Sequence, residues 1–521
     1  MFSNPGSTEV PFLALLPDDF TFILGLHEGS VVGMATGYAI ALGTPALVLV
    51  HTTAGLGNAV GAIATARVNR AQLVIVVGQQ DRRHLAFEPF LTGRLAGLAG
   101  GYPLDVLEPA RGADVPAAIA RAAFTAQQGR GPVIVIVPMS DWLEAAEPDA
   151  MAAAARVEVA PPGPSPAVRE VAAMLADARN PALVVGAGMD TEAGWTASVE
   201  LAQLLEAPVR LEPFGARAAF PQDHPLYRGQ VPANRSRVRQ AFRDHDVVLV
   251  LGTAVLRQYP YQEGPLFEAG TRVVVVTADP AEANRSPADL AIIGDPAALT
   301  ADLSRELREQ DLPAQSREPV SDVSAAPTVP PARPTADGPL HAADVFTLMA
   351  GLLGEDSVVV EESPSSRPAL QAILPARRPL GFLSAAMGGL GFALPAAIGV
   401  RMALPERPVV AVMGDGSSLY CIQALWTAAT TGTGVLFIVL ANGGYAVMDR
   451  LAEQRNAKPA WPAFPEVSVR TLAAGFGVKA VRVDQHDHLA ALLADVLPSL
   501  AQRTSPLLIE VGVVADSTFQ P

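Results

Sequence analysis

The sequence has a single cysteine, Cys421, among its 521 residues. One thiol excludes an internal disulfide framework and a zinc site built from several cysteines. Charged residues are also scarce, at 17%, and acidic residues outnumber basic ones, giving a formal net charge of −15. An acidic chain without clusters of lysine and arginine argues against nucleic acid or anionic membranes as partners. The single thiol fits a reducing compartment, and we expect a cytoplasmic protein.

Long hydrophobic runs are also missing. The longest uncharged apolar stretch, residues 385–400, holds four glycines and a proline, and it is shorter than the roughly 20 residues that a membrane-spanning helix needs. The first twelve residues have no basic region followed by an apolar core, so we expect no secretory signal peptide. Hydrophobic residues nevertheless make up 50% of the chain. The sequence therefore predicts large buried cores and no membrane partner.

Two proline-rich stretches divide the chain. One covers residues 161–166, and the other, with seven prolines, covers residues 313–339. Both are typical of extended linkers. They leave three segments, residues 1–155, 167–310 and 340–521, and we expect each to be a domain.

Each segment alternates short apolar runs with alanine-rich stretches that favour helices. Continuous apolar runs separated by helices are typical of parallel strands that are buried on both faces. The sequence therefore predicts an α/β protein of three domains, each a parallel sheet flanked by helices. The expected strands are residues 46–50, 73–77 and 133–137 in the first segment, 182–185, 247–251 and 273–277 in the second, and 409–413, 435–440 and 507–511 in the third.

The first and third segments share one order of features. In each, a strand ends at a polar residue, a glycine-rich turn and a small-residue helix follow, and a second strand ends 27 positions further on. The interval runs from His51 to Gly78 in the first segment and from Asp415 to Asn442 in the third. We interpret the segments as two copies of one α/β unit. Such copies often bind a ligand between them, at the carboxyl ends of their strands.

The strongest chemical signal is the turn Gly-Asp-Gly at residues 414–416, with Asn442 at the end of the next strand. Glycines on both sides of the aspartate let backbone N–H groups approach an anion. A hard cation such as Mg²⁺ binds oxygen ligands and usually joins a carboxylate to phosphates. Asp415 offers a carboxylate, and Asn442 and Gly444 offer carbonyl oxygens. Ser417 can donate to a phosphate, whereas the alternative is an unrelated Asp-Gly turn.

Two further stretches offer candidate binding residues. Glu28 follows an apolar strand at residues 22–24 and precedes an apolar helix rich in glycine and alanine. The alternative is an ordinary glutamate at a helix N-terminus, favoured by the helix dipole. In residues 385–395 small side chains permit close backbone approach, and the bulky Leu390 stands among glycines. The alternative there is a glycine-rich turn that packs two helices together.

The Gly-Asp-Gly turn with its spaced asparagine resembles the diphosphate-binding signature of thiamine-diphosphate-dependent enzymes. The resemblance spans nearly the whole chain and implies thiamine diphosphate and Mg²⁺ as cofactors, with Asp415, Asn442 and the Gly444 carbonyl as metal ligands. The family usually has two adjacent asparagines, whereas this chain has Ala441 and Asn442. The retained asparagine is the one expected to bind the metal. The resemblance also implies diphosphate contacts at Ser365, Gly416, Ser417 and Tyr445.

The same resemblance implies roles at the other half of the cofactor. Glu28 would hydrogen-bond the N1′ nitrogen of the aminopyrimidine, Leu390 would bend the cofactor, and the Gly388 carbonyl would accept from its 4′-amino group. In this family the two halves of the site come from neighbouring subunits. We therefore expect a homo-oligomer with active sites at subunit interfaces, as a dimer of dimers. Relatives carry a further helix and strand before the turn at Asn4, and a start at Met1 would remove that strand.

One branch of the family matches best at His51, which precedes a small, glycine-rich turn as in benzoylformate decarboxylases. Acetolactate synthases typically have a Gly-Pro-Gly turn and no histidine there. The branch implies that Ser7 binds the carboxylate of a 2-oxo acid and that His51 handles a proton. The implied reaction is the non-oxidative decarboxylation of benzoylformate or a similar acid. A capping or core histidine and an ordinary turn serine are the structural alternatives.

Departures from that branch leave the substrate open. Benzoylformate decarboxylases carry a second active-site histidine from the middle domain, and Tyr259 stands at the matching place. A phenol is a poorer proton donor than imidazole at neutral pH, which would favour carboligation; a carboligase similar to acetolactate synthases is therefore the alternative function. Asp449 and Arg450 would make a more polar wall if they face the site. The expected pocket residues are Phe90, Leu91, Tyr259 and Met448.

The middle segment has a glycine turn at residues 186–188 that resembles part of a dinucleotide-binding turn. Thr191 stands where the third glycine is expected, and no acidic partner for a ribose is evident. We interpret this segment as a vestigial nucleotide fold, with a bound flavin as the alternative. A regulatory relative that has lost catalysis is a further alternative, disfavoured by the retention of Glu28 and Asp415.

Overall fold

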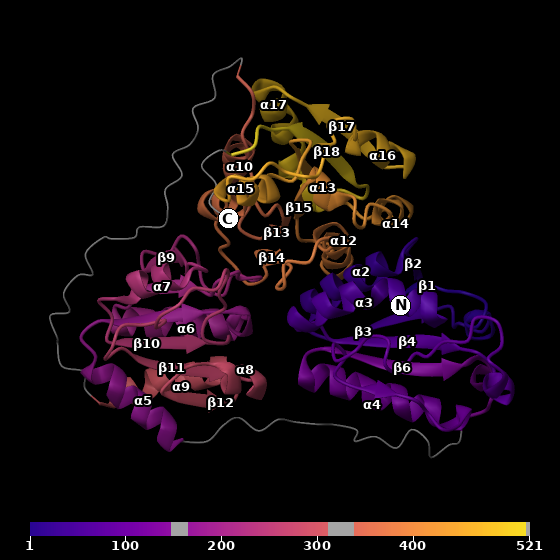
Figure 1. Ribbon diagram of the computed structural model, residues 1–521, viewed down its shortest axis with the longest axis horizontal. Helices are drawn as coiled ribbons and strands as arrows, with labels where there is room; N and C mark the ends of the chain where they lie inside the picture. The colour runs from indigo at the N-terminus through magenta and orange to yellow at the C-terminus, as the bar shows by residue number, and fades with distance from the viewer. Residues whose placement is uncertain (147–164, 311–337, 517–521) are drawn as a thin grey trace. The chain divides into compact units, whose positions relative to one another are not determined.

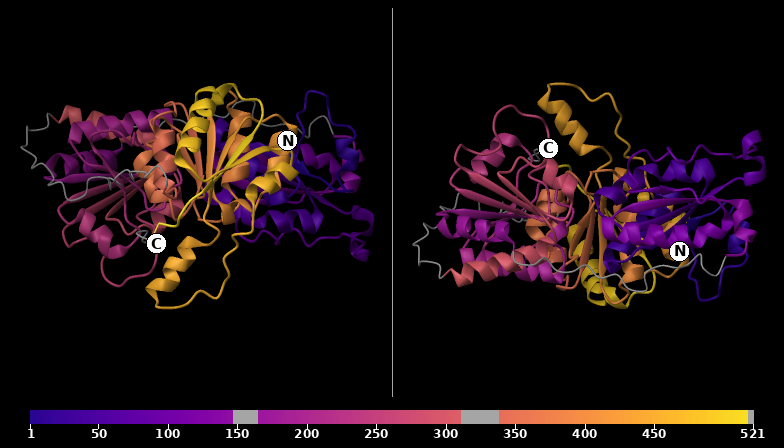
Figure 2. Two further views of the ribbon diagram at one scale, coloured as in Figure 1. Left: turned by 90° about the horizontal axis from the view of Figure 1, so that it is seen from above. Right: turned by 90° about the horizontal axis from the view of Figure 1, so that it is seen from below.

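The computed structural model describes residues 1–146, 165–310 and 338–516. Within these residues the chain forms three six-stranded parallel sheets (Figure 1). Helices flank the strands of each sheet, as Figures 1 and 2 show. The expected α/β class with three parallel sheets is confirmed. The two proline-rich stretches lie mostly outside the described residues; the first ends at Pro166, where helix α5 begins.

The first sheet has the strand order β2-β1-β3-β4-β6-β5. Its long strands are continuous apolar runs that are buried along almost their whole length, as expected for a sheet covered on both faces. His51, at the end of β3, is paired with Gly78 of β4. The strands are β1 (Phe2–Asn4), β2 (Ile23–Leu24), β3 (Ala46–His51), β4 (Leu73–Gln79), β5 (Val106–Leu107) and β6 (Pro132–Pro138), and the α-helices are α1 (Val10–Leu13), α2 (Glu28–Leu42), α3 (Thr52–Val68) and α4 (Val115–Gly129).

The third sheet repeats this order, as β14-β13-β15-β16-β18-β17. Strands at the same position along the chain are therefore neighbours in both sheets, which agrees with two copies of one unit. The strands are β13 (Val358–Glu362), β14 (Phe382–Ser384), β15 (Val409–Gly414), β16 (Leu436–Ala441), β17 (Lys479–Val483) and β18 (Leu507–Gly512). The α-helices are α10 (Ala342–Ala350), α11 (Arg367–Ile373), α12 (Ala393–Ala403), α13 (Asp415–Ser418), α14 (Ala424–Thr430), α15 (Ala446–Gln454), α16 (Val469–Gly475) and α17 (His486–Val496).

The middle sheet differs in topology, with the order β12-β11-β10-β7-β8-β9. Counted along this segment, that is the doubly wound order of dinucleotide-binding folds. The strands are β7 (Pro181–Val185), β8 (Val209–Leu211), β9 (Tyr227–Gln230), β10 (Val247–Leu251), β11 (Arg272–Thr277) and β12 (Leu290–Ile293), and the α-helices are α5 (Pro166–Asp177), α6 (Glu192–Leu205), α7 (Arg235–Phe242), α8 (Pro280–Arg285) and α9 (Pro296–Glu309).

Helices α2 and α12 join the first and third sheets, which belong to one compact unit. Glycines bring the two helix backbones together. A methyl group built on Gly37 would lie 2.1 Å from the Ala396 carbonyl oxygen, and one on Gly399 would lie 1.9 Å from the Met34 carbonyl oxygen. Any larger residue at either glycine would force the helices apart. The packing thus links the helix that begins at Glu28 to the third sheet.

The segment Ala369–Leu383 belongs to the second compact unit, together with the middle sheet. Asp190 accepts a hydrogen bond from the Leu380 N–H at 3.1 Å, and Gln222 exchanges two hydrogen bonds with the backbone of Ala376. Arg217 forms an isolated bridge with Leu383. Residues from the third part of the sequence therefore complete the middle unit.

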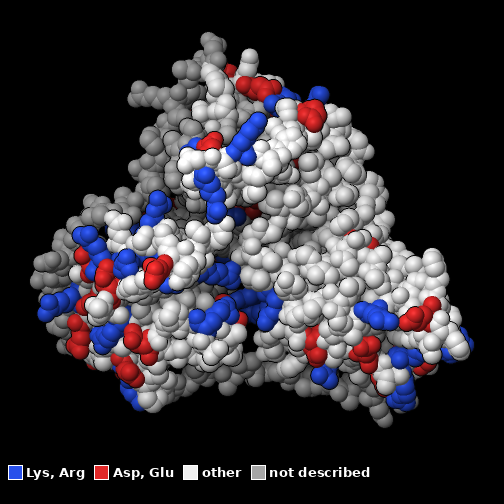
Figure 3. All heavy atoms as spheres, viewed as in Figure 1, with Lys and Arg blue, Asp and Glu red and all other residues white. Residues whose placement is uncertain are grey.

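All nine strands expected from apolar runs are present, with ends that shift by at most two residues. The apolar stretch at residues 385–400 forms a loop and most of α12. None of the helices in the described ranges is long and apolar enough to span a bilayer. Much of the face drawn in Figure 3 carries neither acidic nor basic side chains, in keeping with the low charge of the sequence.

Candidate active site

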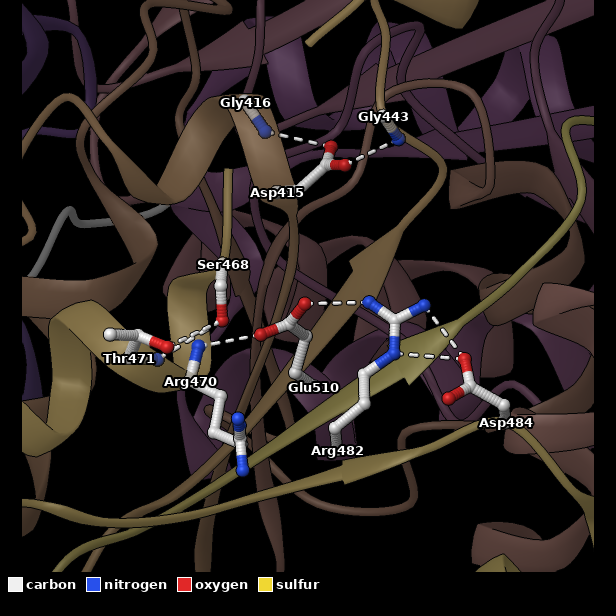
Figure 4. A network of polar contacts seen from close by, with 9 residues as sticks. All are labelled: Asp415, Gly416, Gly443, Ser468, Arg470, Thr471, Arg482, Asp484 and Glu510. Carbon is white, nitrogen blue, oxygen red and sulfur yellow. Dashed lines mark hydrogen bonds and ion pairs between the residues drawn. The ribbon is translucent and has the colours of Figure 1, made fainter. Parts of the chain in front are cut away.

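The Gly-Asp-Gly turn lies at the carboxyl edge of the third sheet. Asp415 begins α13 directly after β15, and Asn442 follows the adjacent strand β16. Gly414 and Leu440 are paired in register, so both polar residues leave the sheet at the same edge. The Asp415 carboxylate is 5% exposed and accepts hydrogen bonds from the N–H groups of Gly416 (2.8 Å) and Gly443 (2.7 Å) (Figure 4). The aspartate therefore ties the ends of two neighbouring strands together.

The donor atoms at this edge fit a hard cation. Asn442 Oδ1 accepts from the Gly444 N–H at 3.0 Å, so the side chain is held in the same loop as the predicted carbonyl ligand. Burial raises the pKa of Asp415, and backbone N–H bonds oppose that shift. Among the described residues, no cluster of three or more His, Cys, Asp and Glu could hold a metal ion. A metal here would take a single carboxylate with amide and carbonyl oxygens, a set that suits Mg²⁺ bound to phosphates.

An aromatic pair packs on the glycine turn. A methyl group built on Gly416 would lie 2.9 Å from Tyr445 Cε1 and 3.2 Å from Phe464 Cζ. The Phe464 N–H donates to the Gly443 carbonyl oxygen at 2.8 Å, so the segment after α15 folds back onto the loop. Helix α15 and that segment extend away from the sheet (Figure 2). Of the predicted diphosphate contacts, Ser417 is 9% exposed, Tyr445 is 37% exposed and Ser365 is half-buried.

A second network in the view of Figure 4 stabilises the neighbouring edge of the sheet. Glu510 on β18 is 2% exposed and accepts from Arg482 Nη1 at 2.6 Å and from the Arg470 N–H at 2.5 Å. Arg482 also donates to Asp484 Oδ1 from Nε at 2.8 Å. These bonds hold β17 and α16 against β18. The charged groups therefore have a structural role.

Glu28 is the first residue of α2, and it is 8% exposed. Its Oε2 accepts a hydrogen bond from Asn58 Nδ2 on α3 at 3.1 Å. His27 caps the helix by accepting from the Gly29 N–H at 3.0 Å. The carboxylate is thus held between two helices that both begin at the carboxyl edge of the first sheet.

His51 is held by a buried carboxylate that sequence reasoning missed. Glu9 is fully buried, and its Oε2 lies 3.1 Å from His51 Nδ1. Thr8 Oγ1 lies 3.0 Å from the same nitrogen, and a methyl group on Gly6 would lie 2.3 Å from His51 Cγ. A carboxylate at Nδ1 favours the tautomer that carries its hydrogen on that nitrogen. Ser7 is exposed in the same turn.

The only sequence signal for Glu9 was its place two residues after Ser7 in one turn. The structure places it against a distant glycine. A methyl group on Gly78 would lie 1.6 Å from Glu9 Oε1, so the strand end opposite His51 must be glycine. The residue after His51, Thr52, has a φ of 36°, which is unusual for a β-branched residue and marks local strain.

The loop before α12 carries the predicted aminopyrimidine contacts. Gly388 and Gly391 have φ values of 71° and 92°, which only glycine adopts readily. A methyl group on Gly388 would meet no atom within 4 Å, so this part of the backbone borders open space. Leu390 is half-buried between the two glycines.

The predicted pocket residues are all exposed. Phe90 is 88% exposed, and Leu91 and Met448 are 39% and 46% exposed, all in the first unit. Tyr259 is 59% exposed and belongs to the second unit, so its place at the site stays a prediction. Asp449 Oδ1 accepts from Trp461 Nε1 at 2.9 Å, and Arg450 pairs with Glu453 at 2.5 Å.

The glycine turn of the middle sheet already holds a carboxylate. Glu212, which directly follows β8, accepts from the Ala187 N–H at 3.0 Å, and its other oxygen accepts from the Thr253 hydroxyl. A methyl group on Gly188 would lie 2.7 Å from the Gly252 carbonyl oxygen. A pyrophosphate at this turn would meet a negative charge and a packed backbone.

Comparison with known proteins agrees with this geometry. Three family models match the chain: the N-terminal TPP binding domain of thiamine pyrophosphate enzymes over residues 1–96, the central domain over 168–303 and the C-terminal TPP binding domain over 365–511. The benzoylformate decarboxylase of Pseudomonas aeruginosa is 37% identical, over 98% of this chain and 95% of its own length.

A solved structure gives the same result. The thiamine diphosphate-dependent 4-hydroxybenzoylformate decarboxylase of Rhodococcus jostii RHA1 superposes with a TM-score of 0.90 at 33% identity, covering 99% of this chain and 96% of that one. The acetolactate synthase isozyme 1 large subunit of Escherichia coli is more distant, at 26% identity over 99% of this chain and 92% of its own length. The chain belongs to the thiamine pyrophosphate enzymes, within the branch of the benzoylformate decarboxylases.

Proposed function

We propose that this protein catalyses the non-oxidative decarboxylation of an aromatic 2-oxo acid, benzoylformate or a close relative, to an aldehyde and CO₂. The observation that carries the proposal is the His51–Glu9 pair at the end of β3, set in a chain of this branch. It provides an oriented imidazole beside an exposed serine, which suits a substrate that carries a carboxylate.

When bound, thiamine diphosphate supplies the carbanion nucleophile and the electron sink that a 2-oxo acid needs to lose CO₂. The residues of the third sheet would hold it. Asp415, Asn442 and the Gly444 carbonyl would bind Mg²⁺ to its diphosphate. Further contacts would come from the Gly416 N–H, Ser365, Ser417 and Tyr445.

The residues of the first sheet would act on protons. The Glu28 carboxyl would exchange a proton with N1′ of the aminopyrimidine, which Leu390 and the Gly388 carbonyl would orient. Ser7 would donate a hydrogen bond to the substrate carboxylate. His51 would pass a proton at Nε2, with Nδ1 fixed by Glu9.

A carboligase similar to acetolactate synthases is the second candidate. The exposed phenol of Tyr259 favours it, because the branch relatives are expected to place a second histidine there. Analysis of the products from pyruvate and from benzoylformate with added aldehyde separates the two. Release of the free aldehyde as the main product supports the decarboxylase.

We further propose a cytoplasmic homo-oligomer, a dimer of dimers, in which Glu28 of one subunit serves the diphosphate site of another. Mixing two inactive variants, Glu28→Gln and Asp415→Ala, tests the shared site. Sites built from two subunits would regain part of the activity in the mixture. Sites contained in one chain would not.

The deciding experiment measures CO₂ release from benzoylformate, 4-hydroxybenzoylformate and pyruvate, with thiamine diphosphate and Mg²⁺ added. Glu28→Gln is the control, because the amide keeps the shape and cannot exchange the proton at N1′. We expect release from the aromatic acids, with loss of about 10²- to 10⁴-fold in the variant. Full activity in the variant removes the assigned role of Glu28, and no release from any 2-oxo acid removes the function.

A further inference from the structure

The loop of residues 385–392 is anchored at both ends by buried polar side chains from distant parts of the chain. It connects β14 to α12 and carries Gly388 and Leu390. Its two glycines with positive φ give it a backbone path that is neither helix nor strand. Whatever holds the loop therefore also sets where Gly388 and Leu390 lie.

Asn69 anchors the start of the loop. It follows α3 of the first sheet and is 8% exposed. Its Oδ1 accepts from the Ala386 N–H at 2.9 Å, and its Nδ2 donates to the Ser384 carbonyl oxygen at 2.7 Å. Both halves of the amide are used. An aspartate could replace the first bond but would place an oxygen against the Ser384 carbonyl.

Glu362 anchors the end of the loop. It is the last residue of β13 and is 4% exposed. Its Oε1 accepts from the Gly391 N–H at 2.7 Å, and its Oε2 accepts from the N–H groups of Phe392 (2.6 Å) and Ala393 (2.7 Å). These N–H groups precede and begin α12, where no intrahelical acceptor exists for them. One carboxylate thus fixes three successive backbone units.

Glu362 caps helix α12 although it lies on a strand and is distant from the helix in sequence. An ordinary helix cap comes from the residue just before the helix. Glu362 instead lies three residues before Ser365, the predicted diphosphate contact. The neighbouring Glu361 bonds Arg367 Nε at 2.7 Å and Ser384 Oγ at 3.0 Å. The strand end that leads to the diphosphate residue is therefore tied to both ends of the loop.

We propose that Glu362 and Asn69 are positioning residues that hold the loop of residues 385–392 ready for the aminopyrimidine ring before the cofactor binds. The proposal rests on the proposed function, in which this loop receives thiamine diphosphate. Neither residue needs to touch the cofactor. Their effect is to remove the conformational freedom that binding would otherwise have to take from a glycine-rich loop.

The test uses two variants of the full chain, Glu362→Gln and Asn69→Ala, of which the second removes both hydrogen bonds of the Asn69 amide. Glutamine keeps the shape of glutamate but turns an NH₂ group toward backbone N–H donors. The first measurement is amide hydrogen exchange at residues 386 and 391–393 in the cofactor-free protein. The second is the affinity for thiamine diphosphate with Mg²⁺, measured by calorimetry. We expect exchange to accelerate and affinity to fall, each by about tenfold or more, since each variant breaks buried hydrogen bonds.

Asp295→Ala is the matched control. Asp295 caps α9 in the middle unit by accepting from the Ala298 N–H at 2.8 Å. Its loss removes an acidic helix cap far along the sequence from the loop. We expect its cofactor affinity to equal that of the unmodified protein. An equal loss of affinity in this control would overturn the proposal, because any weakened helix cap would then suffice.

The outcomes separate this proposal from the proposed function. If the unmodified protein binds no thiamine diphosphate, the proposed function fails, and unchanged exchange in the variants would overturn the anchoring as well. If it binds and Glu362→Gln binds equally well, the positioning role is overturned. If Glu362→Gln does not fold, Asn69→Ala decides by the same two measurements.

Discussion

Two glycine turns in this protein each follow a parallel strand, but the carboxylate that binds their backbone N–H groups comes from a different place in each. After β7 the Ala187 N–H donates to one oxygen of Glu212, and the Thr253 hydroxyl donates to the other. After β15 the carboxylate belongs to the turn itself. Asp415 accepts hydrogen bonds from the Gly416 N–H in its own turn and from the Gly443 N–H after β16. In the first turn a glutamate from the neighbouring strand end occupies the N–H group, whereas in the second the turn's own carboxylate lies in the same loop region as the exposed Asn442.

The difference teaches that strand order does not decide binding. The middle sheet has the doubly wound order of dinucleotide-binding folds. One glutamate and a packed backbone at Gly188 nevertheless fill the place where a pyrophosphate would bind. The ligand preference of each turn is set by the side chains that surround it.

Replacing Asp415 with alanine should have the largest effect. It removes the only predicted carboxylate ligand and frees the Gly443 N–H. We expect cofactor affinity to fall more than about 100-fold, beyond the loss seen when outer partners of a metal ligand are removed. Calorimetry with thiamine diphosphate and Mg²⁺ measures it. Glu212→Gln is the control, and equal losses in both variants would erase the contrast between the turns.

Variants of the imidazole pair should come next. His51→Ala should lower kcat/KM by about 10²- to 10⁴-fold, because it removes a proton-transferring group. Glu9→Gln should cost less, about tenfold, since the imidazole stays but loses the carboxylate that fixes Nδ1. A pH profile of kcat/KM distinguishes them. An unchanged profile in Glu9→Gln would contradict an orienting role.

Truncating Glu212 should affect stability alone. Glu212→Ala leaves the Ala187 N–H and the Thr253 hydroxyl without their acceptor in a buried place, which should cost about 1–3 kcal/mol in the free energy of unfolding. Denaturant unfolding measures that change. The unmodified protein should also bind neither NAD nor flavin. Flavin binding with a value of Kd in the micromolar range would show that the turn opens.

The last expected effect is a pH dependence of stability from the third sheet, confined to the interval between two pKa values. Burial raises the pKa of Glu362 to about 7 from 4.5, although three backbone N–H bonds lower it. A carboxyl with a raised pKa in the folded state contributes full stability below 4.5, and the contribution is lost as pH rises through about 7. The free energy of unfolding should therefore decline across this interval. Glu362→Gln should flatten that decline, and an equally steep decline in the variant would assign it to other groups.

Much of the fold could be predicted because apolar strands in parallel sheets are readable as continuous runs. The equal spacing of 27 residues also anticipated that the first and third sheets share one strand order. The Gly-Asp-Gly motif and the spaced asparagine each follow an apolar run, and this pattern correctly predicted that Asp415 and Asn442 share one sheet edge.

The supporting residues could not be predicted in the same way. Glu9 contacts His51 from 42 positions away, and Asn69 contacts Ser384 from 315 positions away. No periodicity encodes such pairs. Glu362 is a polar residue at the end of a buried strand, and the sequence gives no reason for it. The three hydrogen bonds that it accepts form only when β13 and α12 are brought together.

The membership of Ala369–Leu383 in the middle unit has a practical consequence for dissecting the protein. A fragment cut before residue 340 to isolate the third sheet would carry Leu380 and Ala376 without the side chains that bind them. A fragment ending at residue 310 would leave Asp190 and Gln222 without the Leu380 and Ala376 backbone groups that they bind. Exchange of middle domains between relatives should therefore move both stretches of sequence together.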